Sequence, residues 1–268
     1  MKNPPSRRAL STFFHSRAAA LILACASISP AATMAPASGA PDFATPHEVG
    51  EEPAPVLQGT LVCVGDSITE GQPKDQIGEG KDYVSLLREK AGAAHLDLKV
   101  INQGRSGWTT QQYLDNAESI LQGMPADATF VSILLGTNDT RFGNDPDELA
   151  QKSADSLRKL IALYHAKAPQ ARFIIMVPPA VHTSKLTPRL LAANYNKESM
   201  SKIAAMSVAF AKLASTDHHM FINLSHFPTE KQSLDGVHPD AAGHAALADE
   251  IWRSLTSPQL PAGHFRVP

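Results

Sequence analysis

Short apolar runs alternate along residues 58–256 with longer segments in which apolar residues recur at helical spacing. The runs have the length of strands and are apolar almost throughout, as is typical of parallel strands covered on both faces. Five such runs are present: Thr60–Val64, Leu98–Asn102, Thr129–Leu135, Arg172–Val177 and Met220–Leu224. Five strands in alternation with helices predict an α/β fold, a flavodoxin-like three-layer α/β/α sandwich with a five-stranded parallel sheet.

The segments between the runs have the apolar stripe of helices that pack on a sheet. The stripe is clearest in two sets of residues: Tyr113, Ala117, Ile120 and Leu121, and then Leu157, Leu160, Ile161 and Tyr164. Asp145 followed by Pro146 is typical of a helix start, because aspartate caps the helix and proline fits its first turn. We also expect a long helix from about Leu190 to Ala214 and a last helix from Pro239 to Leu255.

The amino-terminal part of the chain has a composition of its own. Residues 1–41 contain four basic residues and no acidic ones, and the apolar stretch Ala18–Ile28 follows the basic part. This order is typical of a secretory signal peptide, which we assign to residues 1–31 with its cleavage site and export route left open. The protein is therefore expected to be exported, either to the periplasm or as a secreted protein. Anchoring as a lipoprotein through Cys25 is the less favoured alternative.

Residues 32–57 are rich in proline and alanine and lack apolar periodicity, which indicates a linker. The alternating pattern of the domain follows at residues 58–256, and a proline-containing tail at residues 257–268 completes the sequence. The sequence therefore predicts one catalytic or binding domain that follows a signal peptide and a linker.

Charge and cysteine content exclude several function classes. The 268 residues carry a net charge of −2, which becomes −6 without residues 1–41, so nucleic acid is not an expected partner. Two cysteines cannot form a disulfide scaffold or a four-thiolate zinc site, and Cys63 lies in an apolar run where burial is expected. No apolar stretch reaches the ~18 residues that a transmembrane helix needs, so no transmembrane segment is expected.

Polar residues stand where the predicted strands end, and ligands of such sheets bind beyond the carboxyl ends of the strands. The first strand runs into Gly65-Asp66-Ser67, where Ser67 suits an exposed nucleophile or simply a turn or helix cap. The third strand runs into Asn138, whose side-chain amide suits a developing oxyanion or an Asx turn.

The other two strand ends carry glycines and a histidine. Gly104 and Gly107 follow the second strand, where backbone N–H groups either bind an anion or turn the chain. After the fifth strand, His238 suits a general base and Asp235 its partner, although a lone histidine before a helix is often structural. A metal site at His238 is a further alternative, with Asp235 or with these histidines as ligands: His218, His219 and His226. No metal-ligand spacing recurs in the sequence, which disfavours it.

Taken together, the ordered blocks Gly-Asp-Ser, Ser-Gly, Gly-Thr-Asn-Asp and Asp-x-x-His-Pro resemble those of the SGNH hydrolases, also called GDSL esterases and lipases. The resemblance covers roughly residues 58–256. It implies a catalytic triad with Ser67 as the nucleophile, His238 as the general base and Asp235 as its partner. It implies neither a metal nor an organic cofactor.

The resemblance also implies an oxyanion hole formed by the backbone N–H groups of Ser67 and Gly107 and by the side-chain amide of Asn138. The glycine of the second block usually lies five residues after a strand-end asparagine, which favours Gly107 and leaves Gly104 as the alternative. Trp108 stands where many members have a small or acidic residue, so the substrate specificity of the pocket does not carry over from the family.

The function implied is that of a serine-dependent carboxylic ester hydrolase that works through a Ser-His-Asp triad and an acyl-enzyme. Because the loops look short, we expect short acyl esters as substrates, in particular O-acetyl groups on carbohydrate. Arg105 and Trp108 are expected to line the substrate pocket, and His182, in the expected pocket wall Pro178–Leu191, to face solvent. The alternatives are a lysophospholipase or arylesterase of the same superfamily and a non-catalytic carbohydrate-binding module. The natural ester, the acyl length and the oligomeric state are left open.

Overall fold

The computed structural model describes residues 57–257, which contain the whole of the predicted domain. The expected signal peptide at 1–31 with Cys25, the linker up to residue 56 and the tail from residue 258 lie outside the described residues. Within residues 57–257, the structure contains no helix that is both long enough and apolar enough to cross a membrane.

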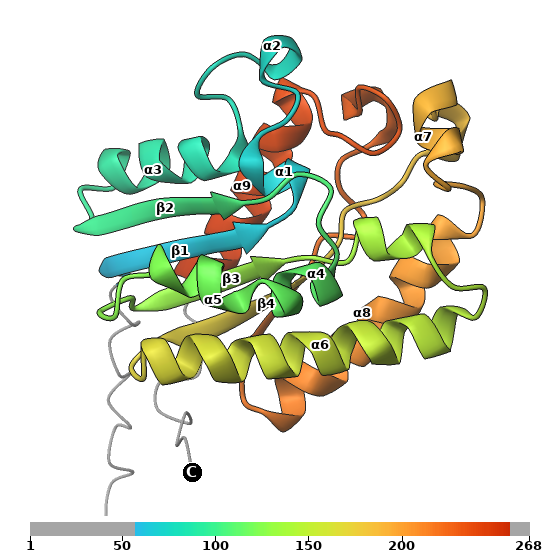
Figure 1. Ribbon diagram of the computed structural model, residues 1–268. Helices are drawn as coiled ribbons and strands as arrows, with labels where there is room; N and C mark the ends of the chain where they lie inside the picture. Colours follow the sequence, from blue (N-terminus) through green and yellow to red (C-terminus); the bar gives the residue numbers. More distant parts are fainter. Residues whose placement is uncertain (1–56, 258–268) are drawn as a thin grey trace, which may run out of the picture. The chain divides into compact units, whose positions relative to one another are not determined.

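The domain is built on a five-stranded parallel sheet with helices on both faces (Figure 1). Its strands are β1 (Gly59–Gly65), β2 (Leu98–Gly104), β3 (Phe130–Leu134), β4 (Arg172–Val177) and β5 (Met220–Asn223). They lie in the order β2-β1-β3-β4-β5, which is the flavodoxin-like order. The predicted fold is therefore confirmed, and each strand ends within two residues of its expected bounds.

Helices form the two outer layers of the sandwich. In the described chain they are α1 (Ser67–Glu70), α2 (Lys74–Ile77), α3 (Tyr83–Ala93), α4 (Thr110–Asp115), α5 (Ala117–Gln122), α6 (Pro146–Lys167), α7 (Pro188–Ala192), α8 (Ser199–Thr216) and α9 (Ala241–Thr256), with short 3₁₀ turns η1 (Asn138–Arg141), η2 (Thr183–Lys185) and η3 (Glu230–Gln232). Helices α3 and α9 pack on the face that carries Leu61 and Cys63, and α4, α5, α6 and α8 on the face with Val62 and Val64 (Figure 1). Successive residues of β1 thus enter opposite layers, as the two-residue period of a strand requires.

Burial differs between the middle and the edges of the sheet. Strand β3 is buried along its whole length, and β1 and β4 are buried except at their first residues. The edge strands β2 and β5 have exposed positions, such as Lys99 and Phe221. The expectation of strands covered on both faces therefore holds for the central strands, because only these have neighbours on both sides and helices on both faces.

Helix α6 has the start and the buried face that its sequence predicts. The Asp145 side chain accepts hydrogen bonds from two backbone N–H groups of the first turn, and Pro146 is the first helical residue. The stripe that contains Leu157 and Leu160 is buried against the sheet. Burial of a large apolar side chain contributes about 1.5–3 kcal/mol, so this face fixes the helix on the sheet.

Two predicted helices are interrupted in the structure. The segment with Tyr113 and Leu121 forms two short helices, α4 and α5, that meet at Asn116. The single helix expected over Leu190–Ala214 is wrong, because α7 ends at Ala192 and α8 begins at Ser199. Asn194, between them, has a φ of 69°, a left-handed conformation that ends a helix and that asparagine adopts more readily than most residues.

The start of the last helix also differs from its prediction. Helix α9 begins at Ala241, with Asp240 as its cap, whose side chain accepts from Gly243 N. Pro239 lies before the helix and forms an isolated bridge with Ser233. The prediction that Pro239 opens the helix is therefore wrong, because Pro239 instead closes the loop that carries His238.

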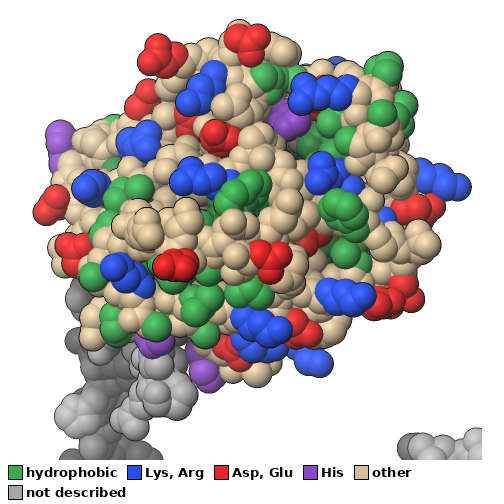
Figure 2. Space-filling model, in the orientation of Figure 1, with side chains coloured by type: hydrophobic (Ala, Val, Ile, Leu, Met, Phe, Trp, Pro, Cys, Tyr) green, Lys and Arg blue, Asp and Glu red, His purple; other side chains and the backbone are tan. Residues whose placement is uncertain are grey.

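Charge on the surface is mixed in sign. Figure 2 shows basic side chains interspersed with acidic ones on the face that it presents. Exposed ion pairs such as Lys152–Glu148 contribute at most about 1 kcal/mol each. This face therefore offers no broad patch of one charge.

Candidate active site

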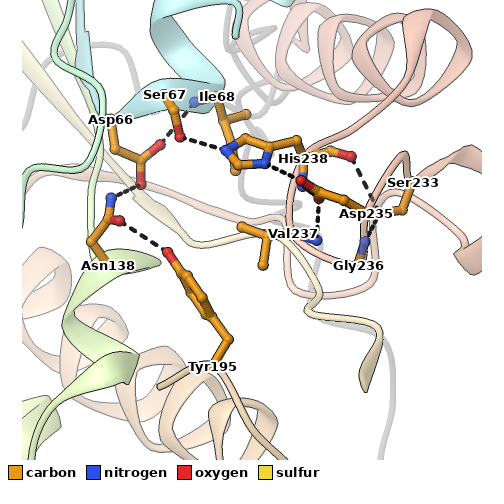
Figure 3. Close-up of polar contacts among 10 residues, drawn as sticks. All are labelled: Asp66, Ser67, Ile68, Asn138, Tyr195, Ser233, Asp235, Gly236, Val237 and His238. Carbon is orange, nitrogen blue, oxygen red and sulfur yellow. Dashed lines mark hydrogen bonds and ion pairs between the residues drawn. The ribbon is translucent and has the colours of Figure 1, made fainter. Parts of the chain in front are cut away.

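Ser67 lies at the carboxyl end of β1, where it is the first residue of the short helix α1 (Figure 3). Asp66 caps this helix, and its Oδ1 accepts a hydrogen bond from Ile68 N at 3.0 Å. The change from strand to helix leaves the Ser67 side chain at the edge of the sheet, and 6% of the residue is exposed. The prediction that Ser67 is exposed is therefore wrong, because the residue is buried and its hydroxyl contacts His238.

Ser67, His238 and Asp235 form a continuous hydrogen-bonded row (Figure 3). Ser67 Oγ lies 2.9 Å from His238 Nε2, and His238 Nδ1 lies 2.8 Å from Asp235 Oδ2. Because a carboxylate only accepts, Nδ1 carries the proton and Nε2 is free to accept from the Ser67 hydroxyl. This geometry is suited to proton transfer from the serine to the histidine.

Asp235 is held as a charged group by its own loop. Burial alone would raise the pKa of Asp235, but hydrogen bonds from His238 and from backbone N–H groups outweigh burial and lower it. Asp235 Oδ1 accepts from Val237 N at 3.0 Å and from His238 N at 2.8 Å, while Oδ2 faces the imidazole. The carboxylate is therefore oriented before any substrate binds.

The loop that carries His238 is closed on itself and braced from outside. Ser233 pairs with Pro239, and Ser233 Oγ accepts from Gly236 N at 3.0 Å. His182 braces the loop, since its backbone N–H donates to Gly236 O at 2.7 Å and its Nε2 lies 2.9 Å from Pro228 O. The prediction that His182 faces solvent is therefore wrong, because the residue is half-buried against this loop.

The two candidate glycines of the second block differ in what their N–H groups do. Gly104 N donates to Asn102 Oδ1 at 2.8 Å, and a Cβ on Gly104 would lie 2.2 Å from Glu70 N. Gly107 has a φ of 80°, and no residue in the described part of the chain accepts its N–H. The Ser67 N–H likewise has no acceptor among residues 57–257. Gly107 and Ser67 thus offer free donors, and Gly104 does not.

Asn138 begins η1, after the end of β3, and its side chain lies across the site from His238 (Figure 3). Its Nδ2 donates to Trp108 O at 3.1 Å and to Asp66 Oδ2 at 3.3 Å, and its Oδ1 accepts from the Tyr195 hydroxyl at 2.9 Å. Both amide hydrogens therefore have acceptors in the resting site. The contact to Asp66 is the longer of the two, so the oxyanion is expected to take its place rather than that of Trp108 O.

Two buried carboxyl groups beside the site were not singled out as functional from the sequence. Burial raises the pKa of Asp66 to about 6, against hydrogen bonds that lower it. Burial also raises the pKa of Asp139, whose carboxylate accepts from Thr110 and Ser153 and so ties η1 to α4 and α6. In the sequence, the two aspartates stand out only because they are adjacent to Ser67 and Asn138. That adjacency does not distinguish a residue that supports the active site from a helix cap.

The two residues expected to line the pocket flank the second-block loop. Arg105 is exposed, and its Nη1 donates to Gly104 O at 3.1 Å. Trp108 is half-buried and its ring meets the Tyr113 ring edge-on, with 5.2 Å between centroids. Since the Trp108 carbonyl accepts from Asn138, this residue adjoins the site. Contact of Arg105 and Trp108 with a substrate stays a prediction.

The histidines of the alternative metal site are not gathered around His238. His219 precedes β5 and stacks edge-on with Phe173, the second residue of β4, at the amino end of these strands. His238 lies at the opposite edge, beside the end of β1. Among residues 57–257, no group of three or more histidine, cysteine or acidic side chains has the arrangement of a metal site.

Comparison with known proteins gives one family match. Residues 63–246 match the sequence profile of the GDSL-like Lipase/Acylhydrolase family. This span begins within β1 and ends within α9, so it includes every residue of the row described above. No curated protein matches the chain in sequence.

Solved structures with the same fold include two esterases. Axe2, an acetylxylan esterase from Geobacillus stearothermophilus, is 21% identical with a TM-score of 0.56, over 75% of this chain and 96% of that one. Est24, a carbohydrate acetylesterase from Sinorhizobium meliloti, is 20% identical with a TM-score of 0.57, over 73% of this chain and 99% of that one. An α/β hydrolase from the metagenome of Lake Arreo, LAE5, is 22% identical with a TM-score of 0.54, over 74% and 96%. At these identities the likeness concerns the fold.

Proposed function

The chain belongs to the GDSL-like Lipase/Acylhydrolase family, the SGNH hydrolases, and we propose that it removes short acyl groups, in particular O-acetyl groups, from carbohydrate esters. The observation that carries this proposal is the row from Ser67 Oγ through the His238 imidazole to Asp235, with contacts of 2.9 and 2.8 Å. A serine hydroxyl is a poor nucleophile at neutral pH, and such a row is what activates it.

In the proposed mechanism, Ser67 Oγ attacks the ester carbonyl carbon while His238 Nε2 takes the hydroxyl proton. The carbonyl oxygen becomes an oxyanion, which accepts hydrogen bonds from the N–H groups of Ser67 and Gly107 and from Asn138 Nδ2. One donor of this kind typically contributes about 2.7–4 kcal/mol of transition-state stabilisation. The imidazolium, stabilised by Asp235, then protonates the leaving alcohol oxygen, and the carbon–oxygen bond breaks to leave an acyl-enzyme.

The second half of the cycle repeats these steps with water. His238 Nε2 takes a proton from a water molecule, whose oxygen attacks the acyl carbon. When the tetrahedral intermediate collapses, the proton returns to Ser67 Oγ and the carboxylic acid leaves. The residues named therefore complete both half-reactions by themselves.

Support for a carbohydrate ester comes from two sources. Axe2 and Est24, which share the fold, are described as esterases of acetylated xylan and carbohydrate. Arg105 is exposed, and the half-buried Trp108 adjoins the site through its carbonyl, which accepts from Asn138. These side chains suit hydrogen bonds and stacking with a sugar. A lysophospholipase, an arylesterase and a binding module are the other outcomes of the test.

The proposal is tested with the purified protein and its Ser67→Ala variant on nitrophenyl esters from acetate to laurate, followed by acetate release from acetylated xylan. We expect the wild type to prefer acetate and the variant to lose about 10⁴-fold or more in kcat with unchanged folding. Ser201→Ala, in an exposed serine of α8, is the matched control.

Other outcomes separate the alternatives. A preference for long acyl chains keeps the serine mechanism and moves the substrate to lipids. Turnover of aryl esters without acetate release from xylan indicates an arylesterase. Folded wild-type protein that binds carbohydrate but turns over no ester overturns the proposed enzyme in favour of a binding module.

We also propose that the chain is exported, with residues 1–31 removed as a signal peptide. The basic residues and the apolar stretch Ala18–Ile28 support this proposal. Mass spectrometry of the protein from its own cells tests it, since export predicts a mature amino terminus near residue 32, whereas a lipid on Cys25 identifies the lipoprotein alternative. An intact amino terminus in the cytoplasm contradicts both.

A further inference from the structure

We propose that Tyr195 is a positioning residue, whose hydroxyl holds the Asn138 side-chain amide in the orientation that presents Nδ2 to the oxyanion. The inference rests on the proposed function, because it concerns the same reaction. Its basis is the hydrogen bond of 2.9 Å from the Tyr195 hydroxyl to Asn138 Oδ1 (Figure 3). The two residues are 57 positions apart, and no sequence motif links them.

Tyr195 is fixed by its surroundings. It lies in the turn between α7 and α8, and only 4% of it is exposed. Its ring belongs to an apolar cluster with Val177, Ile203 and Val237, and Val237 adjoins His238. Tyr195 N also donates to Leu190 O at 3.1 Å. The phenol therefore has little freedom to leave Asn138.

The hydrogen-bond partners of Asn138 require one orientation of its amide. Nδ2 faces two acceptors, the Trp108 carbonyl at 3.1 Å and Asp66 Oδ2 at 3.3 Å. A reversed amide would place Oδ1 against both of these oxygens, where no hydrogen is available for a bond. Burial raises the pKa of Tyr195, so the phenol keeps its proton and remains a donor to Oδ1. Tyr195 thus supplies the one donor that the oxygen side of the amide needs.

The backbone of the turn that carries Asn138 is held by other residues. Lys202 Nζ donates to Thr140 O at 2.9 Å and to Phe142 O at 3.1 Å. Arg141 Nε donates to Asn138 O at 3.2 Å. These hydrogen bonds do not involve the Tyr195 hydroxyl, and the Arg141 guanidinium faces the Tyr195 ring, which phenylalanine keeps. Loss of the hydroxyl therefore acts on the Asn138 side chain rather than on the turn.

The consequence for the reaction concerns the moment when the oxyanion forms. Asn138 Nδ2 must then exchange its 3.3 Å contact with Asp66 for the oxyanion, and a fixed Oδ1 lets this occur without rotation of the amide. A donor on Oδ1 also polarises the amide and strengthens the bond that Nδ2 donates. Loss of one neutral hydrogen bond of this kind corresponds to an approximately three- to tenfold lower kcat. KM stays unchanged, because the effect arises only in the transition state.

The experiment compares Tyr195→Phe with wild type on nitrophenyl acetate, alone and in the Asn138→Ala background. Tyr164→Phe is the matched control, since Tyr164 is also a buried tyrosine, and among residues 57–257 its hydroxyl donates only to Gln103, at 3.5 Å. A melting curve of each variant shows that it is folded. The rate of Ser67 phosphonylation by a fluorophosphonate, in which the serine oxygen displaces fluoride, supplies a readout that needs no ester turnover.

We expect Tyr195→Phe to lower kcat and the labelling rate about three- to tenfold with unchanged KM, and to have no further effect once Asn138 is alanine. Tyr164→Phe should leave kcat unchanged. An equal loss of kcat in both backgrounds overturns the inference, because Tyr195 would then act without Asn138. A fully active Tyr195→Phe overturns it as well. If Tyr195→Phe is less stable than wild type, the comparison in the Asn138→Ala background still tests the inference, because a general effect of the phenylalanine on stability would lower kcat in that background too.

These outcomes are distinct from failure of the proposed function. A wild type that is active while Tyr195→Phe is equally active overturns only the role of Tyr195. A wild type that neither hydrolyses esters nor reacts with the fluorophosphonate overturns the serine mechanism and this inference with it.

Discussion

Ser67 Oγ and His238 Nε2 lie 2.9 Å apart, although 171 positions separate the two residues in the chain. Ser67 comes from the end of β1 in the sheet, and His238 from a loop that is closed by the Ser233–Pro239 bridge just before α9. The contact depends on the fold as a whole, but its chemistry rests on a few side chains. Substitutions of these side chains are therefore expected to change rates more than stability.

Asp235→Asn tests the partner of His238. Asparagine keeps an oxygen for the backbone N–H groups of Val237 and His238 but loses the charge that faces the imidazole. We expect kcat to fall about 10²–10⁴-fold with little change in KM, as measured by steady-state kinetics on nitrophenyl acetate. The control is Asp240→Asn, which keeps the helix cap of α9 and should leave kcat unchanged. Wild-type kcat in Asp235→Asn would contradict the role of Asp235.

The pH dependence of activity follows from the charge of the row. Because the pKa of Asp235 is lowered, its carboxylate stays charged throughout the range from about pH 5 to 8. A general base accepts a proton only in its neutral form, so kcat/KM should rise with pH if His238 is the base. The profile is measured at constant ionic strength. A flat profile of an active enzyme argues against His238 as the base.

Alanine at the two second-block glycines should have different consequences. In Gly107→Ala the new side chain has open space, but a φ of 80° costs about 1–2 kcal/mol, so the N–H is displaced and kcat falls. In Gly104→Ala the Cβ would lie 2.2 Å from Glu70 N, so the backbone must move and stability falls more. Urea unfolding and kcat are measured for both. Full activity of Gly107→Ala together with wild-type stability of Gly104→Ala would refute both assignments.

His244 should make the fold sensitive to acid. Burial lowers the pKa of His244 from 6.5 to about 4, so between these values the unfolded chain binds more protons than the folded one. The free energy of unfolding that depends on neutral His244 therefore decreases as the pH falls from 6.5 towards 4. Asp66, with a pKa raised from 3.8 to about 6, acts in the opposite direction between those values.

A variant isolates the contribution of His244. In His244→Gln the new side chain is close to histidine in size but does not titrate. Its loss of the 3.3 Å hydrogen bond from Tyr83 N to His244 Nδ1 lowers stability by the same amount at every pH, so the pH dependence is what distinguishes it from wild type. Between pH 7 and pH 5 the wild type should lose about 2 kcal/mol of unfolding free energy relative to this variant. Urea unfolding at each pH measures this, with His226→Gln, at an exposed histidine, as the control. Parallel curves for wild type and His244→Gln would show that His244 does not titrate in this way.

Trp108→Leu tests the proposed sugar surface. The carbonyl that accepts from Asn138 belongs to the backbone and remains, so kcat on nitrophenyl acetate should be nearly unchanged. KM for acetylated xylooligosaccharides should rise about three- to tenfold, because the stacking surface is lost. Trp252→Leu, at the half-buried tryptophan of α9, is the control. An unchanged KM for the oligosaccharide removes Trp108 from the substrate surface.

Much of the fold follows from local sequence pattern. The continuous apolar run from Leu61 to Val64 predicts a buried strand. The other four apolar runs predict the other strands in the same way, because each run shows the apolar composition of a buried strand by itself. Helical periodicity predicts where helices lie but not where they are interrupted. It continues through Asn116 and through the turn at Asn194, so it does not reveal that the chain breaks there. Packing of Tyr195 into its apolar cluster accompanies the second break.

The sequence by itself determined which residue types stand at the strand ends, since Ser67, Asn138 and His238 each follow or approach an element that the pattern predicts. Only the tertiary structure decided which of their atoms meet. Gly104 N is taken by Asn102, which leaves the Gly107 N–H free, and Tyr195 reaches Asn138 across 57 positions. The physical reason is that a hydrogen bond needs two atoms within about 3 Å, and their separation is set by packing of the whole domain rather than by local pattern.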